Sequence, residues 1–263
     1  MPELPEVETT VRGLKTLLGA RIERVEVLDP RLEVSEDALR GAVIQGIKRR
    51  GKYIVFDLSA DRSLIVHLRM SGRLILRCAP EERRYARLIL TLDRGTLHFV
   101  DPRRLGTAAI EENGFRHRLG VDPFDPQFTV DRLGEMLSIS RAPVKPFLMD
   151  QKRIAGIGNI YACEILAEAK IDPRRPARSL SPEEVERLRV AVLSVLQRAI
   201  DRMGTSLGTS ISDYRESSGR YGSFQDRLRA YGREGEPCPR CGKTIVRIVQ
   251  AGRSTYYCPG CQR

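Results

Sequence analysis

Four cysteines near the C-terminus constrain the fold of this chain more than any other feature. Cys238-Pro-Arg-Cys241 and Cys258-Pro-Gly-Cys261 form the pattern C-x2-C-x16-C-x2-C, a spacing at which four thiolates can surround one tetrahedral zinc ion. Between the two pairs, Thr244–Val249 and Ser254–Tyr257 have the composition of strands. The pattern therefore predicts a two-stranded zinc ribbon with one structural zinc, because four thiolates leave the metal no open coordination position.

Two disulfides are the alternative for the same cysteines. We expect no signal peptide or apolar membrane span before the fold, and the reducing cytoplasm that this implies favours zinc. Cys78 and Cys163 are distant in sequence and lie in apolar surroundings. We expect both to be small buried side chains rather than ligands or nucleophiles.

The charge balance favours a polyanionic partner. The 263 residues include 45 Lys and Arg against 34 Asp and Glu, a formal net charge of +11. Zinc bound by four thiolates would bring the charge to about +9. Nucleic acid is the commonest polyanion in a cytosol, so the composition favours nucleic acid and not a membrane. The length predicts two domains in addition to the ribbon.

Short strand-like runs fill the chain from residue 21 to about residue 110. Turn residues such as Gly51 and Ser71-Gly72 separate them, which predicts a β-sandwich or barrel that follows one N-terminal helix. The expected strands are Ile22–Val27, Val43–Lys48, Tyr53–Leu58, Leu64–Leu68, Arg73–Arg77, Arg87–Leu92, Thr96–Val100 and Thr107–Ile110.

Beyond the proline-rich segment 120–126 the pattern becomes helical. Thr129 is a candidate N-cap, Asn159–Ala169 predicts a short helix, and Ser181-Pro-Glu-Glu184 fits a capping box before a longer helix that ends near Gly204. These elements predict a helical bundle. The segment Gly204–Tyr221 is rich in Ser, Gly and Arg, and we expect it to form a mobile loop.

The first eight residues, MPELPEVE, admit two interpretations. In the first, they begin a surface helix, because Leu4, Val7 and Val11 recur at helical spacing and Pro5 suits a first turn. In the second, the initiator Met is removed before the small residue Pro2, which leaves a secondary amine. An α-amino group has a pKa of roughly 7.7–8.0, so a useful fraction is neutral near neutral pH. Such an amine attacks an aldehyde-like carbon to give an iminium ion, which is lyase chemistry.

These features, in this order, resemble bacterial formamidopyrimidine-DNA glycosylases over essentially the whole chain, and the opening PELPEVE differs from that of the related endonuclease VIII. The resemblance implies an α+β fold: an N-terminal helix and β-sandwich in residues 1–120, a helix–two-turn–helix DNA-binding domain in 126–215, and a four-cysteine zinc finger in 228–263. The matching segments are Met1–Thr9, Arg49–Tyr53, His67–Gly72, Asp101–Gly106, Lys145–Asp150, Gly156–Ala162, Tyr231–Gly235 and the ribbon from Pro237.

The resemblance also implies an activity, the bifunctional removal of oxidised purines from duplex DNA. Pro2 matches the nucleophile that forms a Schiff base with C1′ of the sugar, and Glu3 matches the proton donor. Lys52 matches the residue assigned to β-elimination, and Arg253, in the ribbon, the one tied to δ-elimination. A damaged base must leave the duplex before C1′ can be reached.

Side chains that contact DNA are implied in the same way. Met70, Arg103 and Leu105 match the positions that fill the space left by the extruded base, although Phe is usual where this chain has Leu105. Without the resemblance, Met70 fits a core position. Phosphate contacts are implied for His67, Arg103 and Asn159, and on a looser match for Arg84 and Arg141.

Two other functions stay open at this point. One is a glycosylase for oxidised pyrimidines, and the other is a zinc-ribbon DNA-binding protein without catalysis. We expect the partner to be double-stranded damaged DNA, the protein to act as a monomer, and the location to be the bacterial cytoplasm, where binding to DNA would associate it with the nucleoid.

Overall fold

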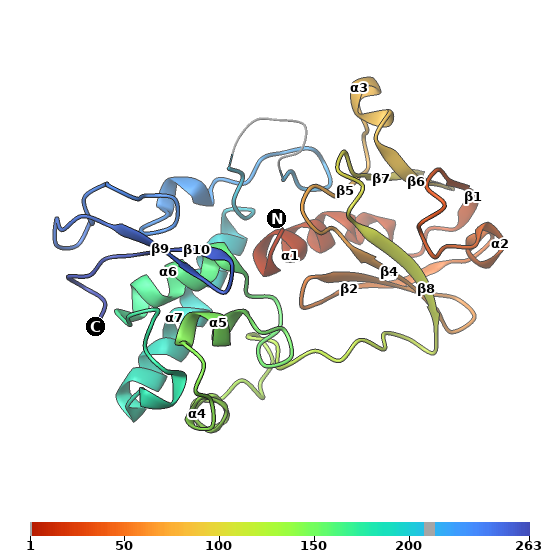
Figure 1. Ribbon diagram of the computed structural model, residues 1–263. Coiled ribbons are helices and arrows are strands. Elements are labelled where there is room, and N and C mark those ends of the chain that lie inside the picture. The colour runs from red at the N-terminus through yellow and green to blue at the C-terminus, as the bar shows by residue number, and fades with distance from the viewer. Residues whose placement is uncertain (1, 208–213) are drawn as a thin grey trace. The chain divides into compact units, whose positions relative to one another are not determined.

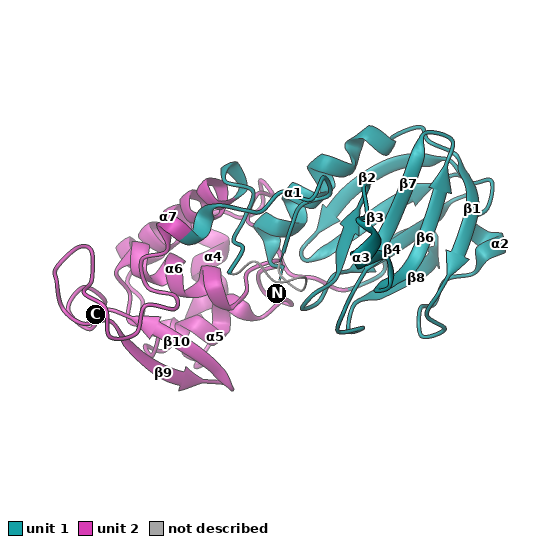
Figure 2. Cartoon of the chain, turned by 90° about the horizontal axis from the view of Figure 1, so that it is seen from above, with its two compact units in different colours: residues 1–117, 200–225 teal, residues 118–199, 226–263 magenta. Residues whose placement is uncertain are grey.

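A computed structural model describes residues 2–207 and 214–263. The chain forms two compact units, shown in different colours in Figure 2. Unit 1 comprises residues 1–117 and 200–225, and unit 2 comprises residues 118–199 and 226–263. Each unit is described below by itself. The division into three domains remains a prediction.

Unit 1 contains, in its described residues, two four-stranded antiparallel sheets in the strand orders β1-β6-β7-β5 and β2-β3-β4-β8. Figure 1 shows their course through the N-terminal half. The elements are α1 (Leu4–Leu14), a 3-10 turn (Lys15–Leu17), β1 (Ile22–Val27), α2 (Glu36–Leu39), β2 (Ile44–Arg50), β3 (Tyr53–Leu58), β4 (Arg62–His67), β5 (Arg73–Ile75), α3 (Pro80–Arg83), β6 (Ala86–Leu92), β7 (Gly95–Val100) and β8 (Thr107–Glu112).

One hydrophobic cluster holds both sheets and α1 together. Its members recur at every second residue in β3 (Ile54, Phe56, Leu58) and in β6 (Leu88, Leu90, Leu92), as expected for one face of a strand. Val7, Val11 and Leu14 of α1 belong to the same cluster. The predicted sandwich after an N-terminal helix is confirmed. The helix is not a surface helix, because its buried residues include Glu6, Thr9 and Thr10 as well as the apolar side chains.

The segment from residue 200 onward returns to unit 1 and packs against α1. Thr205 donates its backbone N–H to Oε1 of Glu6 at 2.7 Å, and the backbone N–H of Leu76 in unit 1 donates to the carbonyl of Ser217 at 3.0 Å. The sequence predicts a mobile loop over Gly204–Tyr221. Residues 208–213 of that range lie outside the described residues, and the described part includes Ser206, Tyr214 and Glu216, whose side chains are buried.

Unit 2 contains the helices α4 (Val130–Ser138), α5 (Val144–Met149), α6 (Asn159–Ala169) and most of α7 (Pro182–Asp201). The predicted caps are present. The Thr129 hydroxyl accepts the backbone N–H of Arg132 at 3.1 Å. The backbone N–H of Ser181 donates to Oε2 of Glu184 at 2.9 Å, and that of Glu184 donates to the Ser181 hydroxyl at 3.3 Å.

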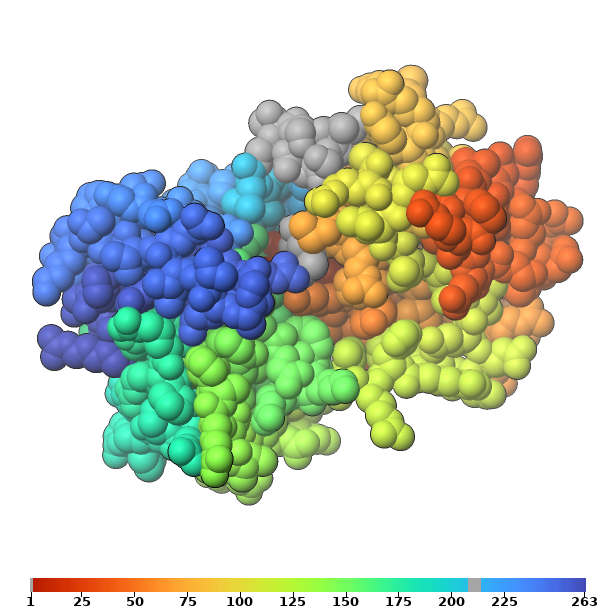
Figure 3. Space-filling model, in the orientation of Figure 1, coloured from red at the N-terminus to blue at the C-terminus, as the bar shows by residue number. Residues whose placement is uncertain are grey.

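The C-terminal ribbon consists of β9 (Val246–Gln250) and β10 (Arg253–Tyr257), paired antiparallel as predicted. In Figure 3 the blue ribbon lies directly on the green and teal helices of the same unit, and β10 contacts α6. The segment before the ribbon is fixed by Glu164 of α6. Its buried carboxylate accepts the backbone N–H groups of Arg229, Ala230 and Tyr231 at 2.8–2.9 Å.

Some local expectations need correction. The short helices α2, α3 and α5 were not predicted, because runs of four to six residues carry too little periodicity to be recognised. Cys163 is buried as expected, but Cys78 is only partly buried and its thiol lies 3.6 Å from the carbonyl oxygen of Ala79. Among the described helices, none has the length and apolar character needed to cross a membrane.

The contact between Gly204 and Glu6 gives a test of the packing on α1. Gly204 has φ +80°, and a Cβ there would lie 2.6 Å from Oε1 of Glu6. Gly219 has φ +92° with no atom within 4 Å, so Gly219→Ala serves as the matched control. We expect Gly219→Ala to cost about 1–2 kcal/mol for the left-handed backbone. Gly204→Ala should cost about 1–3 kcal/mol more because of the clash. If urea unfolding showed the same loss of unfolding free energy for Gly204→Ala and Gly219→Ala, the close packing of Gly204 against Glu6 would be contradicted.

Candidate active site and DNA-contacting residues

The predicted nucleophile lies at a fixed helix end. Pro2 and Glu3 precede α1, with Glu3 as the N-cap residue, and both are buried. The backbone N–H of Glu3 donates to Oε2 of Glu6 at 2.8 Å, while Oε1 of Glu6 accepts the N–H of Thr205. Glu6 therefore ties the residue next to Pro2 to the segment that follows α7. Residue 1 lies outside the described residues, so removal of the initiator Met remains a prediction.

Lys52 lies in the tight turn between β2 and β3, next to Gly51 at φ +57°, and is 8% exposed. Tyr53, the next residue, pairs with His67 across β3 and β4, and their rings meet edge to face with centroids 4.6 Å apart. The charge on Lys52 contributes to the pKa of His67. The hairpin of β3 and β4 thus brings Lys52, in the turn before β3, near His67 at the end of β4.

His67 is neutral at physiological pH. Burial, together with the charges of Arg69 and Lys52, lowers its pKa to about 3. Nδ1 accepts the backbone N–H of Arg69 at 3.0 Å, so the remaining proton is on Nε2. A neutral Nε2–H can donate to a phosphate oxygen, but this side chain adds no positive charge to the surface.

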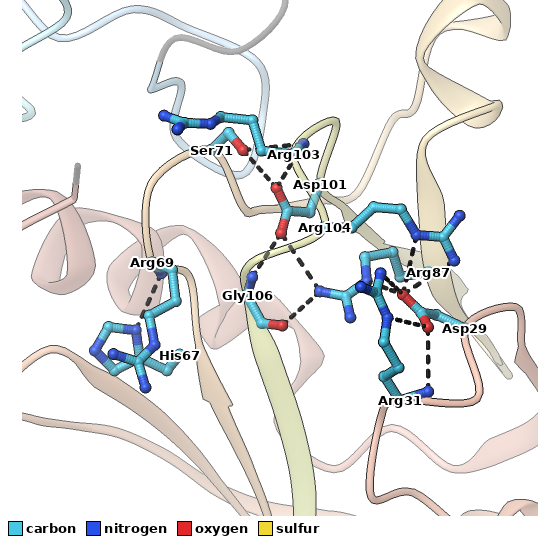
Figure 4. Close-up of polar contacts among 10 residues, drawn as sticks. All are labelled: Asp29, Arg31, His67, Arg69, Ser71, Arg87, Asp101, Arg103, Arg104 and Gly106. Carbon is cyan, nitrogen blue, oxygen red and sulfur yellow. Dashed lines mark hydrogen bonds and ion pairs between the residues drawn. The ribbon is translucent and has the colours of Figure 1, made fainter.

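Met70, Arg103 and Leu105 lie on two loops that are bonded to each other. Met70 is in the β4–β5 loop and 36% exposed, and Leu105 is in the β7–β8 loop and 48% exposed. Arg103 is also exposed. The Ser71 hydroxyl donates to Oδ1 of Asp101 at 2.5 Å, and the backbone N–H of Arg103 donates to the same oxygen at 3.2 Å (Figure 4). Met70 is therefore not a core residue, which was the alternative interpretation of the sequence. The two loops present all three side chains to solvent.

Arg84 follows α3 as its C-cap residue, and its guanidinium lies over the ring of Tyr85 at 4.8 Å. It is exposed. The backbone N–H of Asp101, at the start of the loop that carries Arg103, donates to the carbonyl of Tyr85 at 2.9 Å. The residue after Arg84 is therefore bonded to that loop.

In unit 2, a buried lysine joins α5, α6 and the ribbon. Nζ of Lys145, 1% exposed, donates to Oδ1 of Asn159 at 2.6 Å, to the carbonyl of Ser254 at 3.0 Å and to the hydroxyl of Thr255 at 2.7 Å. Nδ2 of Asn159 donates to the same Ser254 carbonyl at 3.0 Å. The side chain of Asn159 therefore holds the residue after Arg253, and its backbone N–H begins α6.

Arg253 begins β10 directly after the turn Ala251–Gly252, where φ is +47° and +70°. It is exposed at the tip of the hairpin. Arg141 is also exposed and lies in the segment before α5. The structure brings Arg253 and Asn159 together through Ser254. Among the described residues, Arg141 makes no hydrogen bond or ion pair to either of them.

The four ribbon cysteines fit one zinc ion. Their sulfur atoms all lie within 4.8 Å of one another, with 3.9 Å between Cys238 and Cys261 and 3.5 Å between Cys241 and Cys258. A tetrahedral site with Zn–S bonds of about 2.3 Å needs sulfur atoms about 3.8 Å apart. Gln262 accepts the N–H of Cys258 and donates to the carbonyl of Ile171, which fixes the cluster to the helical part of unit 2.

Family models match nearly the whole chain. The formamidopyrimidine-DNA glycosylase N-terminal domain matches residues 1–108, the H2TH domain of the same family matches 119–211, and a zinc finger found in FPG and IleRS matches 235–263. This chain belongs to the formamidopyrimidine-DNA glycosylase family. The zinc-finger match and the four close sulfur atoms together identify one structural zinc.

Full-length relatives and solved structures agree with this family. The formamidopyrimidine-DNA glycosylase of Desulfitobacterium hafniense is 42% identical over 100% of both chains, and that of Moorella thermoacetica is 46% identical over 94% of both. The crystal structure of MutM (Fpg) from Thermus thermophilus has a TM-score of 0.91 at 41% identity and covers 99% of this chain and 98% of its own. Lactococcus lactis Fpg bound to abasic-site DNA has a TM-score of 0.88 at 36% identity, covering 99% of each chain.

Sequence reasoning missed the buried charged residues that hold these groups. For Glu6 the sequence allowed a role in orienting the site but favoured an acidic helix start, and Asp101 and Lys145 were part of matching segments without any role. Each makes its bonds to residues that are distant in sequence. Only their place inside DPRRLG and KPFLMD, next to residues with assigned roles, gave a signal.

The low pKa of His67 makes stability depend on pH. The unfolded side chain takes up a proton near the ordinary histidine pKa of 6.5, whereas the folded one does so only near 3. The stabilisation is therefore complete above pH 6.5 and is lost as the pH falls toward 3. His67→Asn keeps an acceptor for Arg69 and removes the titration. Between pH 6.5 and 4, the unfolding free energy of the wild type should fall more steeply than that of the variant, by up to about 1.4 kcal/mol per pH unit. If urea unfolding gave the same dependence of the unfolding free energy on pH for the wild type and for His67→Asn, the low pKa of His67 would be contradicted.

Proposed function

We propose that this chain removes oxidised purines, such as 8-oxoguanine and formamidopyrimidines, from duplex DNA and then cleaves the strand at the resulting abasic site. The observation that carries this proposal is family membership over the full length, with a Pro-Glu pair fixed at the start of α1. Solved complexes of Lactococcus lactis Fpg with abasic-site and Fapy-dG DNA support the same substrate class.

Pro2 is the nucleophile of the proposed reaction. Its secondary amine attacks C1′ of the damaged nucleotide, the bond from C1′ to the base breaks, and the base departs with the electron pair and takes up the proton that the nitrogen loses. The Glu3 carboxyl donates a proton to the ring oxygen as the sugar opens, and the nitrogen and C1′ become an iminium ion. Glu6 serves this step by holding the backbone of Glu3, through the bond at 2.8 Å.

Elimination then breaks the DNA backbone. The iminium acidifies the neighbouring C2′ position, so loss of a proton there expels the 3′ phosphate in β-elimination. Lys52, buried in the turn between β2 and β3, is the residue proposed for this step. Arg253 at the tip of the hairpin is proposed for δ-elimination of the 5′ phosphate, where a guanidinium stabilises the departing anion. Zinc contributes by fixing the ribbon that carries Arg253.

The residues proposed to bind DNA have two roles: some fill the space left by the extruded base, and others contact phosphates. Met70, Arg103 and Leu105, exposed on two connected loops, are proposed to fill the space left by the extruded base. His67, Asn159, Arg84 and Arg141 are proposed phosphate contacts, together with Arg103. The net charge of +11 fits an affinity that falls steeply with salt.

The two alternative functions are not favoured. A non-catalytic DNA-binding protein gives no reason for Pro2 and Glu3 to be held at a buried helix start. A specialised pyrimidine glycosylase of the endonuclease VIII type is not what the family models match. We propose that the protein acts as a monomer. We also propose that it works at the bacterial nucleoid, because the family activity requires access to chromosomal DNA.

Borohydride trapping tests the proposed nucleophile. The wild-type protein, with loss of Met1 verified by intact mass, should form a covalent adduct with an 8-oxoguanine duplex in the presence of borohydride. The same protein carrying an uncleaved N-terminal extension has an amide nitrogen at Pro2, which is not nucleophilic. It should give no adduct and no strand cleavage, but should still bind the duplex. Full-rate cleavage by the extended protein would overturn the proposal.

A pair of isosteric substitutions on α1 tests the proton donor. Glu3→Gln should lower base release by about 10²–10⁴-fold, the range for loss of a general acid. Glu8→Gln is the matched control, because Glu8 lies on the same helix and pairs with Arg12 and Arg49 at 2.9 and 3.1 Å. Single-turnover release of 8-oxoguanine should separate the two variants. Equal rates for Glu3→Gln and Glu8→Gln would show that Glu3 is not the donor.

A further inference from the structure

The loop Asp101–Gly106, which carries Arg103 and Leu105, is held by two buried carboxylates. One is Asp101 within the loop itself, and the other is Asp29, which follows β1. Both are 0% exposed. Figure 4 shows the two carboxylates on opposite sides of Arg87, which bonds to each of them.

Asp29 collects three guanidinium groups. Nε of Arg87 donates to its Oδ2 at 2.7 Å. Arg31 donates from Nε and Nη2 to the two carboxylate oxygens at 3.1 and 2.9 Å, and Arg104 from Nε to Oδ2 at 3.2 Å. The hydrogen bond from Arg31, reinforced by those from Arg87 and Arg104, holds the pKa of Asp29 far below its usual range. Asp29 is therefore a fixed negative charge at every pH of interest.

Arg104 and its neighbour Arg103 point in opposite directions. In Figure 4 the guanidinium of Arg103 extends away from the network, whereas that of Arg104 turns back to Asp29. Arg104 has φ +53°, a left-handed conformation that a residue with a side chain rarely adopts without support. Its backbone N–H bonds to the carbonyl of Asp101 at 3.1 Å. The tight turn and the anchored side chain together place Arg103 outward.

Asp101 and Arg87 fix the two ends of the same loop. Oδ1 of Asp101 accepts the N–H of Arg103, and Oδ2 accepts the N–H of Gly106 at 2.6 Å. Arg87 donates to the carbonyl of Gly106 as well as to Asp29. Asp101 thus bonds to both the beginning and the end of the loop. Asp29 bonds to the side chain of Arg104 in the middle of the loop.

We propose that Asp29 is a positioning residue for Arg103: through Arg104 it holds the turn that directs Arg103 into the space left by the extruded base. The inference rests on the proposed function, which places Arg103 in that space, and goes beyond it by assigning an anchor on a different element. A guanidinium there can hydrogen-bond to the unpaired opposite base. The anchor therefore affects discrimination between opposite bases.

A matched pair of substitutions on the same carboxylate tests the proposal. Arg104→Gln and Arg31→Gln each remove one guanidinium from Asp29, and the two side chains are similarly exposed, at 53% and 60%. Only Arg104 belongs to the loop. If the anchor matters, Arg104→Gln should lower kcat/KM for 8-oxoguanine opposite cytosine by about 10-fold, because small misplacements of a positioned group can cost up to about 10²-fold. Arg31→Gln should stay near the wild type.

A binding readout separates positioning from general loss of structure. A duplex with 2-aminopurine opposite an abasic analogue reports insertion into the gap by a change in fluorescence, without any reaction. Arg104→Gln should reduce this change in fluorescence. It should also reduce any difference in rate between duplexes with cytosine and with adenine opposite the lesion, with an unaltered thermal midpoint. Asp29→Asn should give the same loss of insertion, because the neutral amide loses the charge that holds Arg104, but it should also lower the thermal midpoint, because Asp29 is a buried partner of Arg87.

The outcomes are distinguishable from failure of the proposed function. If the wild type neither traps nor cleaves lesion DNA, the proposed function fails, whatever the variants do. If the wild type is active and Arg104→Gln matches Arg31→Gln in rate, opposite-base preference and fluorescence, the anchoring role of Asp29 is overturned. A drop in rate with unchanged opposite-base preference and insertion would also overturn it.

Discussion

The carboxylate of Glu6 fixes the part of the molecule on which the proposed chemistry depends. It is 1% exposed and bonds to the backbone N–H of Glu3 and to that of Thr205, which is 199 residues from Glu6. Hydrogen bonds to a charged group contribute about 1.5–3 kcal/mol each, and the same buried charge without partners would be strongly destabilising. Pro2 is therefore attached to a backbone whose direction is set before any substrate arrives.

The same device recurs in two other irregular segments of the chain. Asp101 accepts backbone N–H groups at both ends of the β7–β8 loop, and Glu164 accepts three from the segment before the ribbon. Backbone groups in buried irregular segments need partners that no helix or sheet supplies. A carboxylate can satisfy several at once, so each of these segments has one defined conformation.

Regular elements could be predicted from the sequence because their signals are local. Strand alternation gave all eight strands of the sandwich to within a few residues, and the Thr129 and Ser181 caps marked true helix starts. The cysteine spacing located the ribbon for the same reason. The partners of Glu6, Asp29 and Lys145 could not be predicted, since each bond joins residues whose proximity only the folded chain creates. In the sequence, a buried charge is indistinguishable from a surface one.

In the ribbon, the exposed side chain of Arg253 is positioned through its backbone and not through contacts of the side chain itself. Arg253 begins β10, and the carbonyl of the next residue, Ser254, accepts from both Lys145 and Asn159. The other end of β10 runs directly into Cys258 of the zinc site. A strand of five residues is therefore held at one end by a buried cation and at the other by a metal. Because both restraints act on the backbone, the guanidinium of Arg253 stays available for an incoming phosphate while its Cα remains fixed.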